Sequence, residues 1–288
     1  MSNALTTILA GATGLPQTQI TLSSRPPVDH QSNRLYDAQA GKRHLIVKEF
    51  LKTDEFNDAP FREFRALQLL SPLDIAPQPV YFQPHTSTYG PLVVYDYMAG
   101  ESWDRHRPTA AELAQLAELW LTVNAASSDD LWASRGHDQS LDQFTTQLQE
   151  DLQTYADWVE AEFPAGRRAV DQCFMLLESR QPVVSELADH DPPLCFCRAD
   201  PRFANVIQRP DGRLGLVDWE DSGLRDPAKD LADLMTHPNQ ESLVPPKAWQ
   251  AFLKPYLAVH RQSDRHIKRR LQLYLALFPI YWLVKLIR

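Results

Sequence analysis

The sequence predicts an α+β protein of two lobes, in which a small β-rich lobe precedes a larger helical lobe. The chain has 288 residues, enough for two lobes, and 43% of them are hydrophobic, enough to bury a sizeable core. Two apolar segments with the character of strands, residues 44–50 and 91–98, lie in the first third of the chain. From about residue 108 the apolar residues recur at helical spacing. We therefore expect one lobe over residues 1–98 and the other over residues 99–288.

The first predicted strand places a lysine among apolar side chains. Residues 44–50 read His-Leu-Ile-Val-Lys-Glu-Phe. Lys48 alternates with Ile46 and Phe50 and therefore shares their face of the strand. An ammonium group on a buried face needs an anionic partner. The strand thus predicts a carboxylate close to Lys48 in the folded protein.

A helix expected to begin after Asp58 offers that carboxylate. Asp58 is the expected N-cap residue. One face of the helix carries an acid and two leucines, at positions i, i+4 and i+7: Glu63, Leu67 and Leu70. A carboxylate on an apolar face also needs a partner, so Lys48 and Glu63 are predicted to pair. The nearest alternative partners are Lys52 and Glu55.

The second half of the chain is predicted to be helical. Thr109 and Glu112 form a capping-box pattern at the start of a helix. Asp226 is expected to cap a later helix, with Pro227 at its first position. Between them, residues 138–162 carry seven carboxylates and no lysine or arginine. Two further helices are expected around residues 245–260 and 264–287.

The strongest chemical signal is the spacing of three polar residues. Asp200 is followed five residues later by Asn205, and Asp218 stands thirteen residues beyond that. The segment between Asn205 and Asp218 is typical of a β-hairpin, because a Pro-Asp-Gly turn separates two extended arms of equal length. Folding back puts Asn205 beside Asp218, and an amide oxygen next to a carboxylate suits Mg²⁺. Asp200, on the preceding loop, could then face a substrate hydroxyl.

This stretch resembles the catalytic region of the aminoglycoside phosphotransferase and choline kinase family, which is related to the protein kinases. The family carries His-Gly-Asp-x4-Asn and, later, Asp-Trp/Phe-Glu; the chain matches the first Asp, the Asn and the later Asp-Trp-Glu. Arg198 and Ala199 stand where the family usually has His and Gly. The resemblance covers about residues 30–260 and is densest from Leu194 to Met235. It implies a two-lobed protein-kinase-like fold, with an N-terminal nucleotide-binding lobe and a C-terminal catalytic and substrate-binding lobe.

The resemblance also implies a role for each of these side chains. Asp200 would be the catalytic base. Asn205 and Asp218 would hold Mg²⁺. Lys48, positioned by Glu63, would contact the α- and β-phosphates of ATP.

Further nucleotide contacts are implied by weaker matches. Ser32 and Asn33 match part of the family's phosphate loop, although its two glycines are absent, so their side chains would have to contribute to phosphate binding. Backbone groups from Asp96 to Met98 fall at the hinge, where the family binds adenine. Asp230 matches an Asp-Leu-Ala motif whose carboxylate is expected to brace the catalytic loop.

The implied reaction moves the γ-phosphoryl group of ATP, or of GTP, to a hydroxyl of a small molecule. The carboxylates of residues 138–162 would line the acceptor site and favour an amine or a quaternary ammonium; a solvated acidic helix face is the alternative. The alternative function is a pseudokinase or nucleotide-binding regulatory protein without transfer activity. A protein acceptor is disfavoured, because Asp226 begins a helix within eight residues of Asp218, too close for a long activation loop.

Composition narrows the partners and the compartment. A net charge of −8 disfavours a nucleic-acid binder and suits a cationic small substrate. The three cysteines are too few for a disulfide framework and favour a reducing cytoplasm, and buried thiols explain Cys195 and Cys197 better than a zinc site. Residues 1–24 contain no lysine or arginine, which disfavours a secretory signal. The apolar stretch 271–284 is too short to cross a bilayer. The sequence leaves the oligomeric state open.

Overall fold

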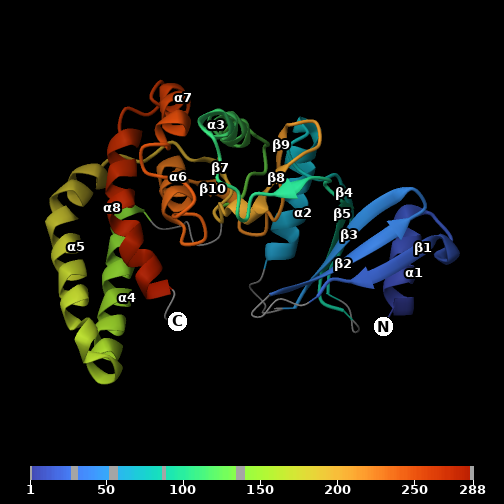
Figure 1. Ribbon diagram of the computed structural model, residues 1–288, viewed down its shortest axis with the longest axis horizontal. Coiled ribbons are helices and arrows are strands. Elements are labelled where there is room, and N and C mark those ends of the chain that lie inside the picture. The colour runs from blue at the N-terminus through green and yellow to red at the C-terminus, as the bar shows by residue number, and fades with distance from the viewer. Residues whose placement is uncertain (1, 27–31, 52–57, 86–88, 134–139, 286–288) are drawn as a thin grey trace. The chain divides into compact units, whose positions relative to one another are not determined.

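The fold is described from a computed structural model, which covers residues 2–26, 32–51, 58–85, 89–133 and 140–285 (Figure 1). The chain divides into two compact units. The first comprises Met1–Trp103 together with Asn205–Ser222, and the second comprises Asp104–Ala204 together with Gly223–Arg288. A segment from the middle of the chain thus belongs to the first unit. This segment contains Asn205 and Asp218, whereas Asp200 belongs to the second unit.

The first unit is built on an antiparallel sheet of five strands in the order β1-β2-β3-β5-β4 (Figure 1). These strands are β1 (Ile20–Ser24), β2 (Asn33–Ala40), β3 (Arg43–Phe50), β4 (Pro79–Gln83) and β5 (Leu92–Asp96). A smaller antiparallel sheet has the order β6-β8-β9, with β6 (Glu101–Ser102), β8 (Val206–Gln208) and β9 (Leu214–Leu216). Two helices accompany the sheets: α1 (Ser2–Thr13) and α2 (Ala59–Leu70). The strand predicted at residues 44–50 is therefore part of β3, and the strand predicted at 91–98 contains β5.

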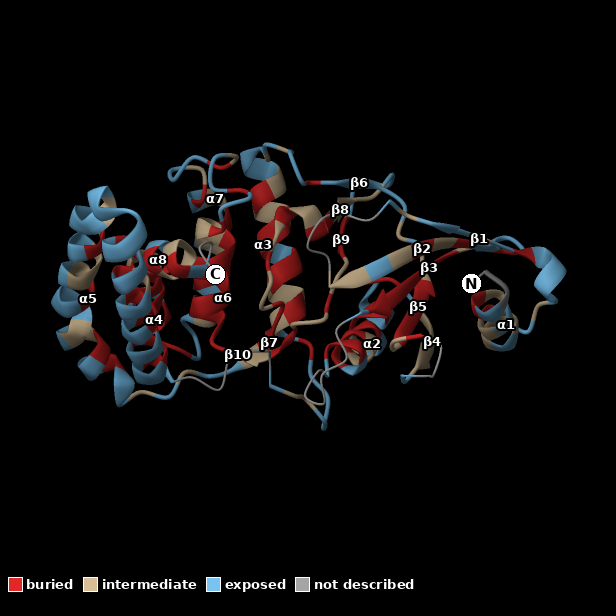
Figure 2. Ribbon diagram, turned by 90° about the horizontal axis from the view of Figure 1, so that it is seen from below, coloured by how far each residue is buried: buried red, intermediate tan, exposed pale blue. Residues whose placement is uncertain are grey.

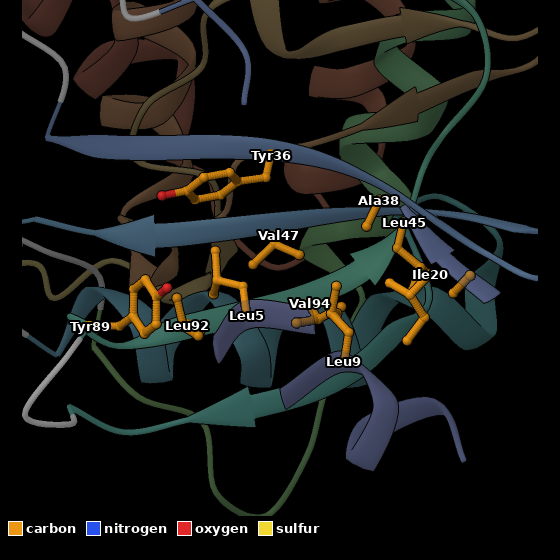
Figure 3. Close-up of a cluster of buried hydrophobic side chains, with 11 residues drawn as sticks. Leu5, Leu9, Ile20, Tyr36, Ala38, Leu45, Val47, Tyr89, Leu92 and Val94 are labelled. Carbon is orange, nitrogen blue, oxygen red and sulfur yellow. The ribbon is translucent and has the colours of Figure 1, made fainter. Parts of the chain in front are cut away.

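A hydrophobic core lies between α1 and one face of the large sheet (Figure 3). Leu5 and Leu9 of α1 contribute to it, with Leu45 and Val47 of β3. Because side chains alternate along a strand, Lys48 points to the opposite face, where it meets α2. The sheet is thus covered on one side by α1 and reached on the other by the helix that carries Glu63. The sequence did not predict α1, although Leu5 and Leu9 stand at helical spacing.

Shortening Leu9 should destabilise the first unit. Leu9 is fully buried, so we expect Leu9→Ala to lower the free energy of unfolding by about 2–5 kcal/mol, because it leaves a cavity between α1 and the sheet. Urea denaturation measures this loss. Leu73→Ala is the control: Leu73 is 45% exposed, so its removal should cost less than about 0.5 kcal/mol. Equal losses in the two variants would contradict the packing of α1 against the sheet.

The helices and strands described in the second unit are six α-helices and one short antiparallel pair of strands, β7 (Cys195–Cys197) and β10 (Gly223–Arg225). Its helices are α3 (Ala110–Asn124), α4 (Leu141–Glu162), α5 (Arg167–Ala188), α6 (Pro227–Thr236), α7 (Gln250–His260) and α8 (Ile267–Lys285). Helix α6 is buried over most of its length, whereas α4 and α5 have long exposed faces (Figure 2). None of the helices among the described residues is long and apolar enough to cross a membrane. Single 3₁₀ turns occur at Gln17–Gln19, Ser71–Leu73, Pro164–Gly166 and Phe203–Asn205.

Several local predictions are confirmed by the helix termini. The capping box of Thr109 and Glu112 is complete, with both reciprocal hydrogen bonds present. The Asp226 side chain accepts from the backbone N–H of Ala228, with Pro227 at the first helical position. Asp58 stands at the N-cap of α2, but its carboxylate forms an ion pair with Arg62 and makes no capping hydrogen bond. The guanidinium of Arg62, one turn away, attracts the Asp58 carboxylate more strongly than a neutral backbone N–H does, which explains why Asp58 makes no capping hydrogen bond.

The acidic segment is mostly solvated. Five of its carboxylates are exposed along α4: Asp142, Glu150, Asp157, Glu160 and Glu162. Asp151 is buried, and Asp138 lies outside the described residues. Phe144, on the buried face of α4, stacks on Phe278 of α8 with ring centroids 5.9 Å apart. Helix α4 therefore directs its apolar side to the helical core and most of its charge to solvent, as the solvated-face alternative predicts.

A buried histidine should make the second unit sensitive to acid. His237 is 7% exposed, and its Nδ1 accepts a hydrogen bond from the backbone N–H of Asn239 at 3.2 Å, which requires that nitrogen to be unprotonated. Burial and the nearby Arg202 lower the pKa of His237 from 6.5 to about 4. The unfolded chain therefore binds the proton more readily. The stabilisation is complete above pH 6.5 and is lost as the pH falls toward 4.

We expect acidification from pH 7 to pH 5 to cost about 2 kcal/mol of stability through His237. Other groups titrate in this range too, so the measurement is a comparison of melting temperatures at both pH values for the wild type and His237→Gln. The glutamine keeps an acceptor but cannot be protonated. The variant should lose less stability on acidification, and an identical loss in both proteins would contradict the prediction.

Candidate active site

The predicted contact between Lys48 and Glu63 is present. Strand β3 supplies the lysine and α2 the glutamate, and Lys48 Nζ donates to Glu63 Oε2 at 2.7 Å. Lys48 is 3% exposed and Glu63 is fully buried. The alternative partners, Lys52 and Glu55, lie outside the described residues. Each buried charge thus receives the counter-charge that it needs.

Two more carboxylates reach the same ammonium. Lys48 Nζ lies 2.5 Å from Asp218 Oδ1 and 2.8 Å from Glu220 Oε2. One oxygen from each of Glu63, Asp218 and Glu220 lies within 4.8 Å of the others. Asp218 was predicted as a metal ligand, but the sequence assigned no role to Glu220. The spacing of Asp218 and Glu220, two residues apart around a buried Trp219, was the available signal.

The cluster carries more negative charge than one lysine neutralises. Burial alone would lower the pKa of Lys48, but Asp218, Glu63 and Glu220 together hold that pKa well above its usual value, so Lys48 stays charged. Burial raises the pKa of Glu63 to about 7; Lys48 opposes this rise, and Asp218 and Glu220 add to it. Three carboxylates around one ammonium leave an excess of negative charge that a further cation would neutralise. Their hard oxygen donors fit Mg²⁺.

The predicted hairpin is confirmed and brings Asn205 next to the same region. Strands β8 and β9 pair antiparallel, with Val206 opposite Leu216. The backbone N–H of Val217 donates to the Asn205 carbonyl at 3.0 Å, which puts Asn205 opposite the residue before Asp218. Asn205 is 8% exposed, and its Nδ2 has no acceptor among the described residues.

Asp218 itself has a strained backbone. Its φ is +67°, in the left-handed region that a residue other than glycine adopts at a cost. Such strain is often found at functional sites, where the surrounding structure imposes it. Here the conformation ends the hairpin and turns the Asp218 carboxylate to Lys48.

Both residues predicted from the phosphate loop make hydrogen bonds within the first unit. Asn33, the first residue of β2, donates from Nδ2 to Glu220 Oε2 at 2.7 Å, so it already contacts the carboxylate cluster. The backbone carbonyl of Ser32 accepts from Leu51 at 2.9 Å. The start of the predicted phosphate loop, residues 28–31, lies outside the described part of the chain.

At the predicted hinge, two backbone N–H groups are used within the first unit. The N–H of Asp96 donates to Gln78, and that of Tyr97 donates to His44, both at 2.9 Å. Asp96 also pairs with Arg43 through its carboxylate. In the described part of the chain, the N–H of Met98 makes no hydrogen bond. Met98 therefore offers the hinge donor that a nucleotide base could use.

In the second unit, the loop that follows β7 carries Asp200. Arg202 donates from Nε to Asp200 Oδ2 at 2.8 Å, an ion pair that the sequence did not predict. The sequence feature that could have predicted this ion pair is a basic residue two positions after the acid, close enough along the chain for the two side chains to meet. Asp230 Oδ1 accepts from the backbone N–H of Ala199 at 2.8 Å, which confirms the predicted brace.

The two departures from the family motif have structural consequences. Arg198, in place of His, is buried, and its Nη2 approaches the Asp200 backbone carbonyl at 3.5 Å. Ala199, in place of Gly, has a φ of +63°. The loop thus keeps a glycine-type backbone conformation without the glycine, which costs about 1 kcal/mol.

Restoring the glycine should therefore stabilise the protein. We expect Ala199→Gly to raise the free energy of unfolding by about 1 kcal/mol, because it relieves the left-handed strain while keeping the N–H donor to Asp230. Denaturant unfolding measures the gain. Ala114→Gly, within α3, is the matched control and should instead lose about 1 kcal/mol. A loss in both variants would contradict the strain at Ala199.

Comparison with known proteins gives one family. The model of the phosphotransferase enzyme family matches residues 24–267. A search of curated proteins found no match. Solved structures with similar folds include a choline kinase from Cryptosporidium parvum, at 15% identity and a TM-score of 0.66, covering 99% of this chain and 88% of that one.

Two further structures are similar to the chain. A choline kinase from Streptococcus pneumoniae is 20% identical with a TM-score of 0.58, and the match covers 98% of this chain and 90% of that one. A spectinomycin phosphotransferase, in complex with ADP and spectinomycin, is 13% identical with a TM-score of 0.63, covering 88% and 78% respectively. These likenesses confirm the predicted protein-kinase-like fold. Through the match over residues 24–267, the chain belongs to the phosphotransferase enzyme family, and the predicted small-molecule kinase class is confirmed.

Proposed function

We propose that this protein transfers the γ-phosphoryl group of ATP to a hydroxyl group of a small molecule, with Mg²⁺ as the metal. The observation that carries the proposal is the buried Lys48, which is held by Glu63 and also meets Asp218 and Glu220. A purely structural ion pair would need one carboxylate, not three. The excess of acidic oxygens beside a fixed ammonium suits a site for a metal and a polyphosphate.

Lys48 would neutralise the phosphates that are not transferred. Its position is fixed by the 2.7 Å bond to Glu63, so little conformational freedom is lost when the nucleotide binds. The N–H of Met98 would donate to the base, and Asn33 would lie close to the phosphates through its bond to Glu220. These residues all belong to the first unit.

Asp218, Glu220 and Asn205 are the residues that would hold Mg²⁺. When bound there, the metal would supply positive charge to offset the phosphate oxygens in the transition state. Asn33 helps to orient the Glu220 carboxylate by donating to Oε2, the oxygen that Lys48 also contacts. As the nucleotide binds, the Lys48 ammonium would exchange its contacts with Asp218 and Glu220 for contacts with the phosphate oxygens. Its three protons allow it to keep the hydrogen bond to Glu63 at the same time.

Asp200 would orient the acceptor hydroxyl and take its proton at a carboxylate oxygen. Arg202, bound to Oδ2, leaves the other oxygen, Oδ1, for that role and limits rotation of the carboxylate. Asp230 and Arg198 support the loop backbone on either side of Asp200. The loop is thus fixed by contacts within the second unit.

The acceptor is proposed as a small hydroxyl-bearing molecule. The similar proteins described as choline kinases and a spectinomycin phosphotransferase support this class. An amine-bearing acceptor agrees with the net charge of −8, but the exposed carboxylates of α4 add little support for it. GTP as donor and a cytoplasmic location stay predictions from the sequence.

The test is release of ADP or GDP from the Mg²⁺-nucleotide in the presence of a panel of hydroxyl-bearing molecules, including choline, ethanolamine, homoserine, sugars and aminoglycosides. The matched control omits the acceptor, so that simple hydrolysis is subtracted. Acceptor-dependent product release would support the proposal and identify the substrate class. Mg²⁺-ATP binding without turnover across the panel would favour the pseudokinase alternative instead.

A further inference from the structure

The helical unit contains a cavity of about 520 Å³. Its described lining comes from α4, α5, β10, α6 and α8 and from the segment before β7. Much of that lining is aliphatic, including Leu141, Leu187, Leu194 and Leu224. A volume of this size and an apolar lining with a few polar groups are typical of small-molecule sites.

The cavity lies at the end of the β7–β10 pair away from the catalytic loop. The loop leaves β7 after Cys197, which pairs with Gly223, whereas the cavity is lined by Arg225, which pairs with Cys195. Asp200 is not among the lining residues. The cavity is therefore separate from the residues proposed for phosphoryl transfer, and binding of a ligand there does not depend on that function.

Lys229 is a buried basic residue in the lining of this cavity. The residue is 5% exposed and lines the cavity from α6. Within the described ranges, no carboxylate lies within hydrogen-bond distance of its ammonium, which lies over the Phe144 ring with Nζ 4.5 Å from the centroid. A cation–π contact contributes about 2 kcal/mol when desolvated, whereas burying an ammonium costs several. Lys229 thus has no carboxylate in direct contact; burial and the charge of Arg225 lower its pKa to about 7, and the charges of Asp233 and Asp226 only partly oppose that fall.

The other cations of the lining are already paired. Arg270 binds Asp226 at 2.9 Å and Asp264 at 2.6 Å. Arg225 lies 3.5 Å from each of two carboxylates, Asp230 and Asp233. Asp226, which also lines the cavity, is neutralised by Arg270 and caps α6. Lys229 is therefore the cation of the lining that an anionic ligand would neutralise.

We propose that this cavity binds a small amphipathic monocarboxylate. The carboxylate would pair with the Lys229 ammonium, and the hydrocarbon part would contact the four leucines. A single negative charge suits the site, because one cation of the lining lacks an anionic partner among the described residues and a second charge would be buried without compensation. An apolar body suits it because the leucines offer no hydrogen bonds.

The test uses three probes of equal chain length on the full-length protein. Isothermal titration calorimetry with octanoate, octanamide and octylamine separates charge from hydrocarbon contact. We expect octanoate to bind at least tenfold more tightly than octanamide, and octylamine to bind most weakly. Lys229→Met should remove the preference and leave octanoate and octanamide equal, because the side chain keeps its length but loses its charge.

Two further variants keep the result interpretable. Lys247→Met, at an exposed lysine of the same unit, should bind all three probes as the wild type does. Ala188→Trp adds bulk at an exposed residue of the cavity lining and should weaken octanoate at least tenfold without removing any charge. The proposal is overturned if octanoate does not bind the wild type, if octanoate and octanamide bind it equally, or if Lys229→Met keeps the preference for octanoate.

Discussion

Replacing Asp200 with asparagine is expected to lower kcat about 10³-fold while leaving the affinity for Mg²⁺-ATP within about twofold. The amide has the shape of the carboxylate, but it cannot take the proton of the acceptor hydroxyl. It also loses the charge that attracts Arg202, now 2.8 Å away, so the loop loses one ion pair. Nucleotide contacts should survive, because Lys48, Glu63 and Asp218 belong to the first unit and are unchanged.

The measurement is the acceptor-dependent rate of ADP release, together with the binding of a fluorescent ATP analogue. Asp191→Asn is the matched control: it makes the same chemical change at an exposed carboxylate of the same unit and should keep the wild-type rate. Retention of most of the rate by Asp200→Asn would remove Asp200 from the proposed role. Loss of nucleotide binding in that variant would show that it acts on something other than proton transfer.

The site contacts that could be predicted from the sequence are those set by local periodicity. Alternation along β3 put Lys48 on an apolar face, helical spacing put Glu63 on the buried face of α2, and each charge required the other. Equal arms around the Pro-Asp-Gly turn similarly predicted the hairpin of β8 and β9, but its register was wrong by one residue, because Asn205 lies opposite Val217 and not Asp218. These contacts follow from rules that act over a few residues, and burial then selects the partner.

The contacts that were missed depend on the path of the chain in three dimensions. Glu220 reaches both Lys48 and Asn33, residues more than 150 positions earlier, and no periodicity relates them. The bend that allows these contacts includes Asp218 at a φ of +67°. An aspartate in a sequence does not by itself predict this left-handed backbone conformation. In the same way, α1 has suitable leucines, but only the sheet shows what they pack against.

Charge patterns were the weakest guide. The acidic run of residues 138–162 was compatible with an acceptor site and with a solvated helix, and the sequence could not separate them. The heptad-like burial of α4 resolves the difference, because Leu148 and Leu152 face the helical core and the exposed acids face away. Conversely, the sequence assigned no role to Lys229, although its burial beside a cavity makes it a better indicator of a ligand site than the acidic run.

Replacing Lys48 with methionine is expected to have a large effect on both activity and stability. Methionine fills a similar space but leaves the buried Glu63 without its counter-charge, which costs about 3–5 kcal/mol. Asp218 and Glu220 lose the same ammonium and repel Glu63 at close range. We expect the melting temperature to fall and kcat/KM to fall at least 10²-fold, since the phosphates lose a fixed positive charge.

The two losses can be separated because Mg²⁺ should affect them differently. In Lys48→Met the three carboxylates form a more negative cluster, so added Mg²⁺ should raise its melting temperature more than it raises that of the wild type. Activity should not recover with Mg²⁺, because the metal does not replace the lysine at the phosphates. Lys42→Met, at an exposed lysine in the turn between β2 and β3, should change neither property. Rates measured well below the melting temperature of each variant would separate catalysis from unfolding. A wild-type rate under those conditions would leave Lys48 as a structural charge and remove the main support for the proposed nucleotide site.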